Sequence, residues 1–206
     1  VKCSTSSGTY SVNWGDGTTS TSVASTVAAE HLYVYAGITN TATSSTTPTV
    51  DGHRQCIVTV TPDSANHLTA IDINISHSRA GLTAARALNW LDVNIAGVYL
   101  AGSTPIIIGS QNGPRQTYLE RVNIGTTGVV TNYSSLFRNC RVLQSVNLFD
   151  TSDCYDFSSM FFGCSVLQNI PLFDMSAGQY YVVEKTSAYV KLSKTLVGSA
   201  IVMSTT

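Results

Sequence analysis

Apolar and polar side chains alternate near the start of the chain with the spacing of β-strands. In residues 9–14 every second side chain is apolar, which is the period of a strand with one buried face. Further apolar stretches follow at 25–37 and 54–62, and Pro62 ends the second of them. The segment 38–52 between them is rich in Ser and Thr and too polar to lie in a core. The pattern predicts a small module made of strands.

A tight turn is predicted directly after the first strand, at Gly15, Asp16 and Gly17. Glycine adopts the positive φ angles that such turns require, and the Asp16 carboxylate can accept backbone N–H groups within the turn. A metal ligand is the alternative role for Asp16, and we favour the turn. His31 lacks the context of a catalytic triad, so we interpret it as a packing residue at a strand end.

Three pieces of this segment, in order, resemble a polycystic-kidney-disease (PKD) repeat. They are the W-G-D-G turn, an H-x-Y…G pattern at His31, Tyr33 and Gly37, and a last strand that ends in V-T-V-T. The resemblance covers residues 8–62, with a long insertion where the family has a tight turn. It implies an immunoglobulin-like (Ig-like) β-sandwich that serves as an extracellular or virion-surface spacer rather than as a catalyst. We therefore assign residues 1–62 to a PKD-like module.

A longer pattern occurs twice in the second half of the chain. The stretch LFRNCRVLQSVNLFD at 136–150 returns as MFFGCSVLQNIPLFD at 160–174. The shared core is L-x-x-L-x-L, with Val and Ile counted as Leu. Successive copies of this core start 20, 31, 24 and 24 residues apart. Such distances are typical of leucine-rich repeats with one insertion, which we place at 101–116. A further copy that starts at Ile95 overlaps its neighbour and stays an open alternative. The copies begin at residues 68, 88, 119, 143 and 167.

Each copy is expected to form one short strand and an arc that returns to the start of the next copy. A single coil cannot bury its apolar face, so neighbouring coils stack and share one continuous core. Cys140 and Cys164 occupy the same slot in two coils, where small buried thiols pack well. We favour free thiols over the disulfides Cys140–Cys164 and Cys3–Cys56, which both stay open. The predicted core residues are Leu68, Ile71, Ile73, Leu88, Leu91, Val93, Leu119, Val122, Ile124, Cys140, Leu143, Val146, Leu148, Cys164, Leu167, Ile170 and Leu172.

Residues 133–176 resemble the BspA-type leucine-rich repeats of bacterial surface proteins. The family motif, M-F-x-x-C-x-x-L-x-x-L-x-L…F-D-T-S, is matched in both copies, up to the Phe–Asp pairs at 149–150 and 173–174. Over residues 63–132 the match is generic, because the M-F-x-x-C half is missing. A PKD-like module followed by such repeats also resembles structural proteins of tailed phages, especially marine and cyanobacterial ones.

The sequence therefore predicts a mainly β protein with two modules. An N-terminal Ig-like β-sandwich, residues 1–62, is followed by a leucine-rich-repeat solenoid, residues 63–176. Residues 177–206 return to strand character, and we expect them to continue the array or to form a degenerate coil. Because the final residues are apolar rather than a polar cap, we expect the chain to be a piece of a longer protein.

Composition narrows the class of partner. Charged residues make up 11% of the chain and the net charge is −1, which argues against nucleic acid and anionic membrane surfaces as ligands. No apolar run reaches the roughly 18–20 residues of a membrane span. The 5 cysteines lack paired zinc spacing, and neither a metal nor a cofactor is predicted. For Asp150, Asp153 and Asp156 we favour solvated turns over a calcium site, since EF-hand spacing is absent.

No catalytic motif is recognised, since there is no nucleophile elbow, phosphate-binding glycine loop or H-E-x-x-H zinc motif. We therefore expect a non-enzymatic structural protein on the exterior of a phage virion: a tail fibre, a spike or a capsid-surface decoration protein. Its expected partners are other virion proteins, further copies of itself, and a host-surface glycan or protein, without nucleic acid or membrane insertion. The alternatives are a bacterial cell-surface adhesin built from the same modules and an accessory region of a glycan-active enzyme.

Overall fold

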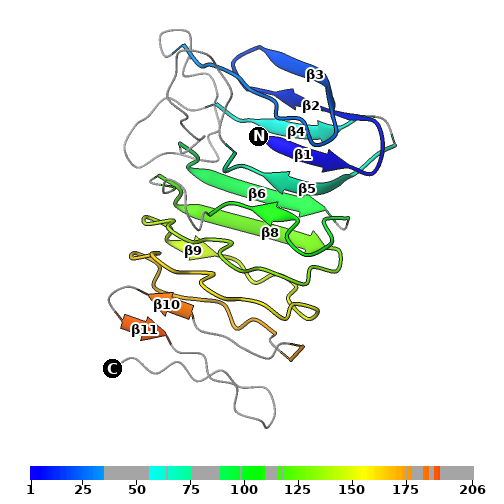
Figure 1. The fold of residues 1–206 in the computed structure, drawn as a ribbon. Helices are drawn as coiled ribbons and strands as arrows, with labels where there is room; N and C mark the ends of the chain where they lie inside the picture. Colours follow the sequence, from blue (N-terminus) through cyan, green and yellow to red (C-terminus); the bar gives the residue numbers. More distant parts are fainter. Residues whose placement is uncertain are drawn as a thin grey trace.

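The chain is mainly made of β-strands, and no helix occurs among the residues that the structure describes. The computed structural model describes residues 1–34, 56–63, 65–75, 89–97, 99–109, 116, 118–174, 176–177, 183–185 and 188–190. Most of the strands lie one beneath another, from β3 at one end to β9 further down (Figure 1). The strands are β1 (Lys2–Thr5), β2 (Thr9–Asn13), β3 (Thr19–Ala24), β4 (Thr59–Pro62), β5 (Leu68–Asp72), β6 (Asp92–Gly97), β7 (Ile106–Ile107), β8 (Arg121–Thr127), β9 (Ser145–Val146), β10 (Val183–Lys185) and β11 (Ala188–Val190).

The first predicted strand is confirmed as β2, the centre of an antiparallel sheet in the order β3–β2–β4. Tyr10 and Val12 are fully buried, whereas Ser11 and Asn13 are partly or largely exposed. Alternation of this kind places one face of the strand against a core and the other toward solvent. The predicted strand at 54–62 appears in shorter form as β4, which pairs with β2 from Tyr10 to Asn13.

A second sheet, in the order β1–β5–β7, joins the two halves of the chain. Strand β1 pairs antiparallel with β5, with Cys3 opposite Ile71, although the two come from different predicted modules. Hydrogen bonding within one sheet holds the two segments together across the boundary drawn at residue 62. Strand β5 then pairs parallel with β7, where Ile71 lies opposite Ile106.

The copy that begins at residue 68 is therefore in a different column from the later copies. The repeat pattern counts Ile71 and Val122 as the same position of two copies, but the two residues lie in different sheets, because β5 pairs with β7. Strand β7 comes from 101–116, where the repeat pattern predicts an insertion; this segment supplies the buried side chains of Ile106 and Ile108. The L-x-x-L-x-L spacing describes one segment at a time, so it does not reveal which sheet the strand joins.

The third sheet, β6–β8–β9, is parallel, and in it equivalent residues of three copies lie opposite one another, as the repeat pattern predicts. We call the stretch from one copy to the next a pass. Val93 lies opposite Val122, and Val122 lies opposite Val146, so the same position of three passes forms one buried column. Leu119, Leu143 and Leu167 are also buried, and so are Ile73, Ile124, Cys140 and Cys164, while Leu68, Leu91 and Ile170 are partly buried. Leu88 lies outside the described residues.

Two predicted core residues are wrong. Leu148 and Leu172 are 62% and 68% exposed, and the neighbouring Phe149 and Phe173 are buried in their place. In the first case the Asn147 side chain bonds both backbone groups of Ile124: its Oδ1 accepts from the N–H at 2.7 Å, and its Nδ2 donates to the C=O at 2.6 Å. An amide side chain thus takes the place of the next peptide of the strand, and the residues after it change face.

The same change of face recurs one pass later by a different route. Pro171 occupies the position equivalent to Asn147, and proline has no N–H with which to continue a strand. The phenylalanines that turn inward pack against each other: the ring centroids of Phe149 and Phe173 are 4.8 Å apart, with their planes tilted by 56°. Phe137 and Phe161 form a stacked pair at 5.2 Å. The core of these two passes is therefore aromatic where the repeat pattern predicted leucine.

The arcs between the strands also repeat their backbone geometry. Asn139 and Gly163, at equivalent positions, both have positive φ angles, of 66° and 78°. A Cβ at Gly163 would lie 2.8 Å from Oδ1 of Asn139, so a side chain there would have to displace the Asn139 amide and adopt a positive φ. The cysteine slot follows directly: Cys140 and Cys164 are buried, and the thiol of Cys164 donates to the carbonyl of Phe137 at 3.0 Å. All five cysteines are free thiols, so neither of the two disulfides left open is present.

Candidate functional site

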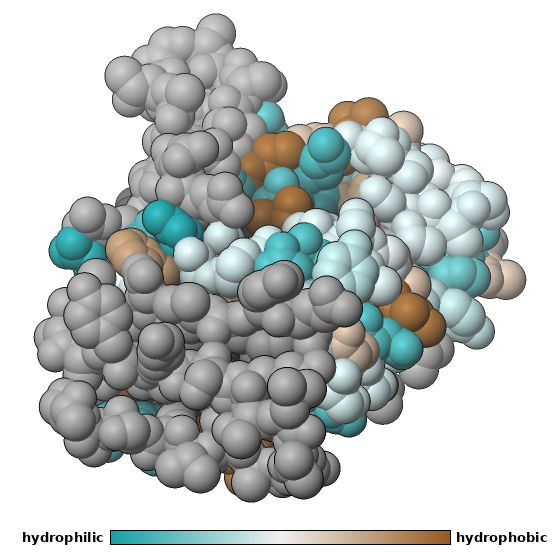
Figure 2. Space-filling model, turned by 60° about the horizontal axis from the view of Figure 1, so that its bottom comes forward, coloured by the Kyte–Doolittle hydropathy of each residue, from teal (hydrophilic) through white to brown (hydrophobic). Residues whose placement is uncertain are grey.

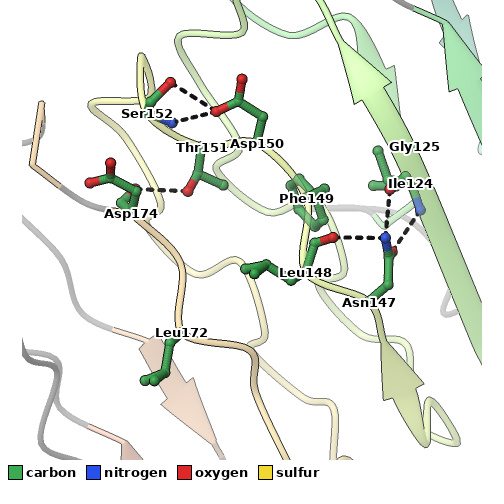
Figure 3. A pocket seen from close by; sticks show the side chains of 10 residues that line it. All are labelled: Ile124, Gly125, Asn147, Leu148, Phe149, Asp150, Thr151, Ser152, Leu172 and Asp174. Carbon is green, nitrogen blue, oxygen red and sulfur yellow. Dashed lines mark hydrogen bonds between the residues drawn. The ribbon is translucent and has the colours of Figure 1, made fainter.

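An open hollow of about 510 Å³ lies on the surface where two consecutive passes leave the β6–β8–β9 sheet. Elsewhere, on the face shown in Figure 2, apolar side chains form separate patches among polar ones. Figure 3 shows the hollow with four polar residues grouped toward one end, Leu172 at the other, and Leu148 between them. The lining residues are Ile124, Gly125, Asn147, Leu148, Phe149, Asp150, Thr151, Ser152, Leu172 and Asp174.

The apolar part of the hollow exists because of the change of face after the strands. Asn147 ends β9 by bonding Ile124, and Leu148 then points outward while Phe149 turns into the core. One pass later Leu172 repeats this orientation. Sequence reasoning placed both leucines in the core and missed the role of Asn147. The available signal was the Phe that follows each leucine, since a larger apolar residue one position on competes for the core.

The acidic part of the hollow is held by two equivalent turns. Oδ1 of Asp150 accepts hydrogen bonds from the backbone N–H and the hydroxyl of Ser152, at 3.0 and 2.8 Å. Oδ1 of Asp174 accepts from the N–H of Ser176 at 2.9 Å, and Thr151 donates to the carbonyl of Asp174 at 2.7 Å. The N–H groups first, and then the hydroxyls, of Ser152 and Ser176 lower the pKa of the Asp150 and Asp174 carboxyl groups respectively. Both carboxylates are ionised at neutral pH, and Oδ1 of each is hydrogen-bonded within its turn.

Asp150, Asp153 and Asp156 were predicted to be turn carboxylates, and the structure supports this for Asp150 and Asp156. Asp150 closes its own turn, and Asp156 accepts from the N–H of Ser158 at 2.9 Å and from Asn132 at 3.1 Å. Within the described part of the chain, no group of three His, Cys, Asp or Glu side chains is placed to hold a metal ion.

The predicted turn at Gly15–Gly17 forms a second polar cluster. Oδ1 of Asp16 accepts from the N–H and the hydroxyl of Thr18, and Oδ2 lies 2.7 Å from Nε2 of His31. The Thr18 hydroxyl first, and then His31, lower the pKa of Asp16 to about 2. The turn needs glycine, because Gly15 has a φ of 77° and a Cβ there would lie 2.5 Å from the carbonyl oxygen of Ile57.

His31 is packed between two aromatic side chains. Its ring stacks on Trp14 at 5.1 Å and meets Tyr33 edge-on at 4.6 Å, while the Tyr33 hydroxyl donates to the carbonyl of Trp14 at 2.7 Å. The W-G-D-G turn and the H-x-Y pattern thus meet in one aromatic cluster, as a structural role requires. Gly37, the third predicted member, lies outside the described residues.

No protein-family model, curated protein or solved structure matches this chain. Across the described residues, there is no helix both long and apolar enough to cross a membrane.

Proposed function

We propose that the chain is a non-enzymatic structural protein of a phage virion exterior, such as a tail fibre, a spike or a capsid-surface component. In this proposal residues 1–62 form a PKD-like sandwich and residues 63–176 a leucine-rich-repeat solenoid. The observation that supports it is the β1–β5–β7 sheet, because it makes one continuous body of the N-terminal strands and the stacked passes.

A continuous stack of this kind suits a spacer that must keep its length. Strands β1 and β5 pair from Lys2–Asp72 to Thr5–Leu68, so rotation between the two segments would break backbone hydrogen bonds. Further along, bonds such as Ser135 N–H to Ser158 O and Phe137 N–H to Met160 O, both 2.9 Å, link successive passes outside the strands. Load applied along the stack is thereby shared among many backbone bonds.

The surface chemistry is also compatible with a particle exterior. Only 11% of the residues are charged, so the chain makes contacts through shape, hydroxyl groups and local patches rather than through a strong long-range field. The two polar clusters at Asp16 and Asp150 consist of side chains that close turns, and this supports a structural reading over a catalytic one.

Mass spectrometry of purified virus particles from the source of the gene tests the proposal. We expect the chain in constant proportion to the major head or tail protein, and we expect gold-labelled antibodies against residues 1–206 to decorate intact particles. Recovery of the chain only from bacterial cell surfaces would instead favour the adhesin. Glycan cleavage by the isolated chain, with no particle association, would favour the enzyme-linked alternative.

A further inference from the structure

The hollow around Leu148 and Leu172 presents two aliphatic side chains to solvent at equivalent positions of adjacent passes. Both side chains line the same hollow, so one ligand bound there can contact the two of them together. The chain produces the outward orientation twice by different means, a side-chain amide at Asn147 and a proline at Pro171. The paired exposure is therefore a feature of both passes and not the result of one irregular turn.

The charge around the hollow has one sign. Asp150 and Asp174 both line it, and the described lining residues include no Lys or Arg. The sequence carries no Lys or Arg between Arg141 and Lys185, although the whole chain has a net charge of only −1. In both lining aspartates Oδ1 is held by the following turn, so the carboxylates are fixed in place before any ligand arrives.

The lining favours a protein segment over a sugar. Among the described residues that line it, the one aromatic residue, Phe149, is 6% exposed and so offers no open ring face on which a sugar could stack. Two leucines beside two fixed carboxylates instead complement a chain that places an aliphatic side chain next to a basic one. The apolar contact supplies affinity, and the carboxylates select the sign of the charge.

We propose that this hollow binds an extended segment of a partner protein that sets a Leu, Ile or Val against Leu148 and Leu172 and a Lys or Arg against Asp150 and Asp174. On a virion the partner is a neighbouring structural protein. The binding chemistry does not depend on that location, so the hollow can be tested apart from the proposed function.

The test is a selection from a library of random displayed peptides, with the full chain as bait, followed by titration of the enriched peptides. We expect enrichment of sequences in which Lys or Arg flanks an aliphatic residue. The double variant Leu148→Ser/Leu172→Ser removes the apolar contact and should weaken binding at least tenfold. Asp150→Asn and Asp174→Asn retain Oδ1 for the turns but lose the charge, so they should weaken binding severalfold and flatten its dependence on salt.

Val129→Ser is the matched control, since Val129 is 57% exposed and does not line the hollow. It should bind the enriched peptides as the unchanged chain does, and circular dichroism should show that all variants are folded. Several results overturn the proposal: no enriched peptide, enrichment of acidic peptides, or binding that survives the double leucine substitution. Binding of a glycan array in place of peptides, lost in the same double variant, also overturns it. None of these results bears on whether the chain is a virion component.

Discussion

Replacing Phe149 or its neighbour Leu148 by alanine tests whether the core contains the residue seen in the structure or the one predicted from the repeat pattern. The L-x-x-L-x-L pattern places Leu148 in the core and makes no prediction for Phe149. In the structure Phe149 is 6% exposed and Leu148 is 62% exposed. The two residues are adjacent in the chain, so a general weakness of this region would affect both variants alike.

The expected magnitudes follow from the contacts. The ring of Phe149 lies 5.2 Å from Tyr133, 4.8 Å from Phe173 and 6.4 Å from Phe137, measured between centroids. Removing a buried phenylalanine side chain costs about 3–5 kcal/mol, because the transfer energy is lost and a cavity is left. An exposed leucine far from such contacts changes stability by about 0.5 kcal/mol or less when truncated. We therefore expect Phe149→Ala to be strongly destabilised and Leu148→Ala to be nearly unchanged.

Urea unfolding followed by tryptophan fluorescence and far-UV circular dichroism measures both variants. With a slope of about 2 kcal/mol per molar urea, Phe149→Ala should lower the midpoint by about 2 M, whereas Leu148→Ala should not move it measurably. If Phe149→Ala fails to fold, Phe149→Leu keeps most of the apolar volume and should still cost about 1 kcal/mol. Equal losses for the two alanine variants, or a larger loss for Leu148→Ala, would refute the assignment of faces.

Three further predictions concern the turn and the thiols. Gly15→Ala should destabilise the chain by about 1–3 kcal/mol in the same urea assay, because the new Cβ would overlap the backbone of Ile57 and φ is positive. The pKa of Asp16 in the folded chain is about 2, below its ordinary value of 3.8, so the contribution of Asp16 to stability is complete above pH 4 and is lost as the pH falls through 2. Asp16→Asn should therefore reduce the acid dependence of the unfolding free energy. An unchanged pH profile of stability would contradict the reasoning. Burial raises the pKa of the Cys140 thiol and brings that of Cys164 to about 12. Neither thiol should therefore react with a thiol reagent at pH 8 until the chain is unfolded. Prompt labelling of either cysteine in the native chain would show that it is accessible to solvent.

Local features could be predicted from the sequence because they depend on neighbouring residues alone. The alternation in 9–14 predicted β2, and Gly15, Asp16 and Gly17 predicted the turn that follows it. The 24-residue spacing of Leu119, Leu143 and Leu167 predicted three buried side chains at equivalent positions. The strand and the turn depend on side-chain period and backbone conformation within a few residues, whereas the buried leucines could be predicted because the repeat itself implies that successive passes pack on one another.

Features that depend on distant partners were decided by the tertiary structure. Leu148 and Phe149 are both apolar, and their faces were settled by Asn147, whose side chain bonds Ile124 in the pass before. The same holds for β5, which lies between β1 and β7 because those strands supply its backbone hydrogen-bond partners. A hydrophobic pattern records which residues prefer burial, but it carries no information on which distant strand will satisfy their backbone. The exposed leucine pair, and with it the candidate site, therefore appeared only once the passes were stacked.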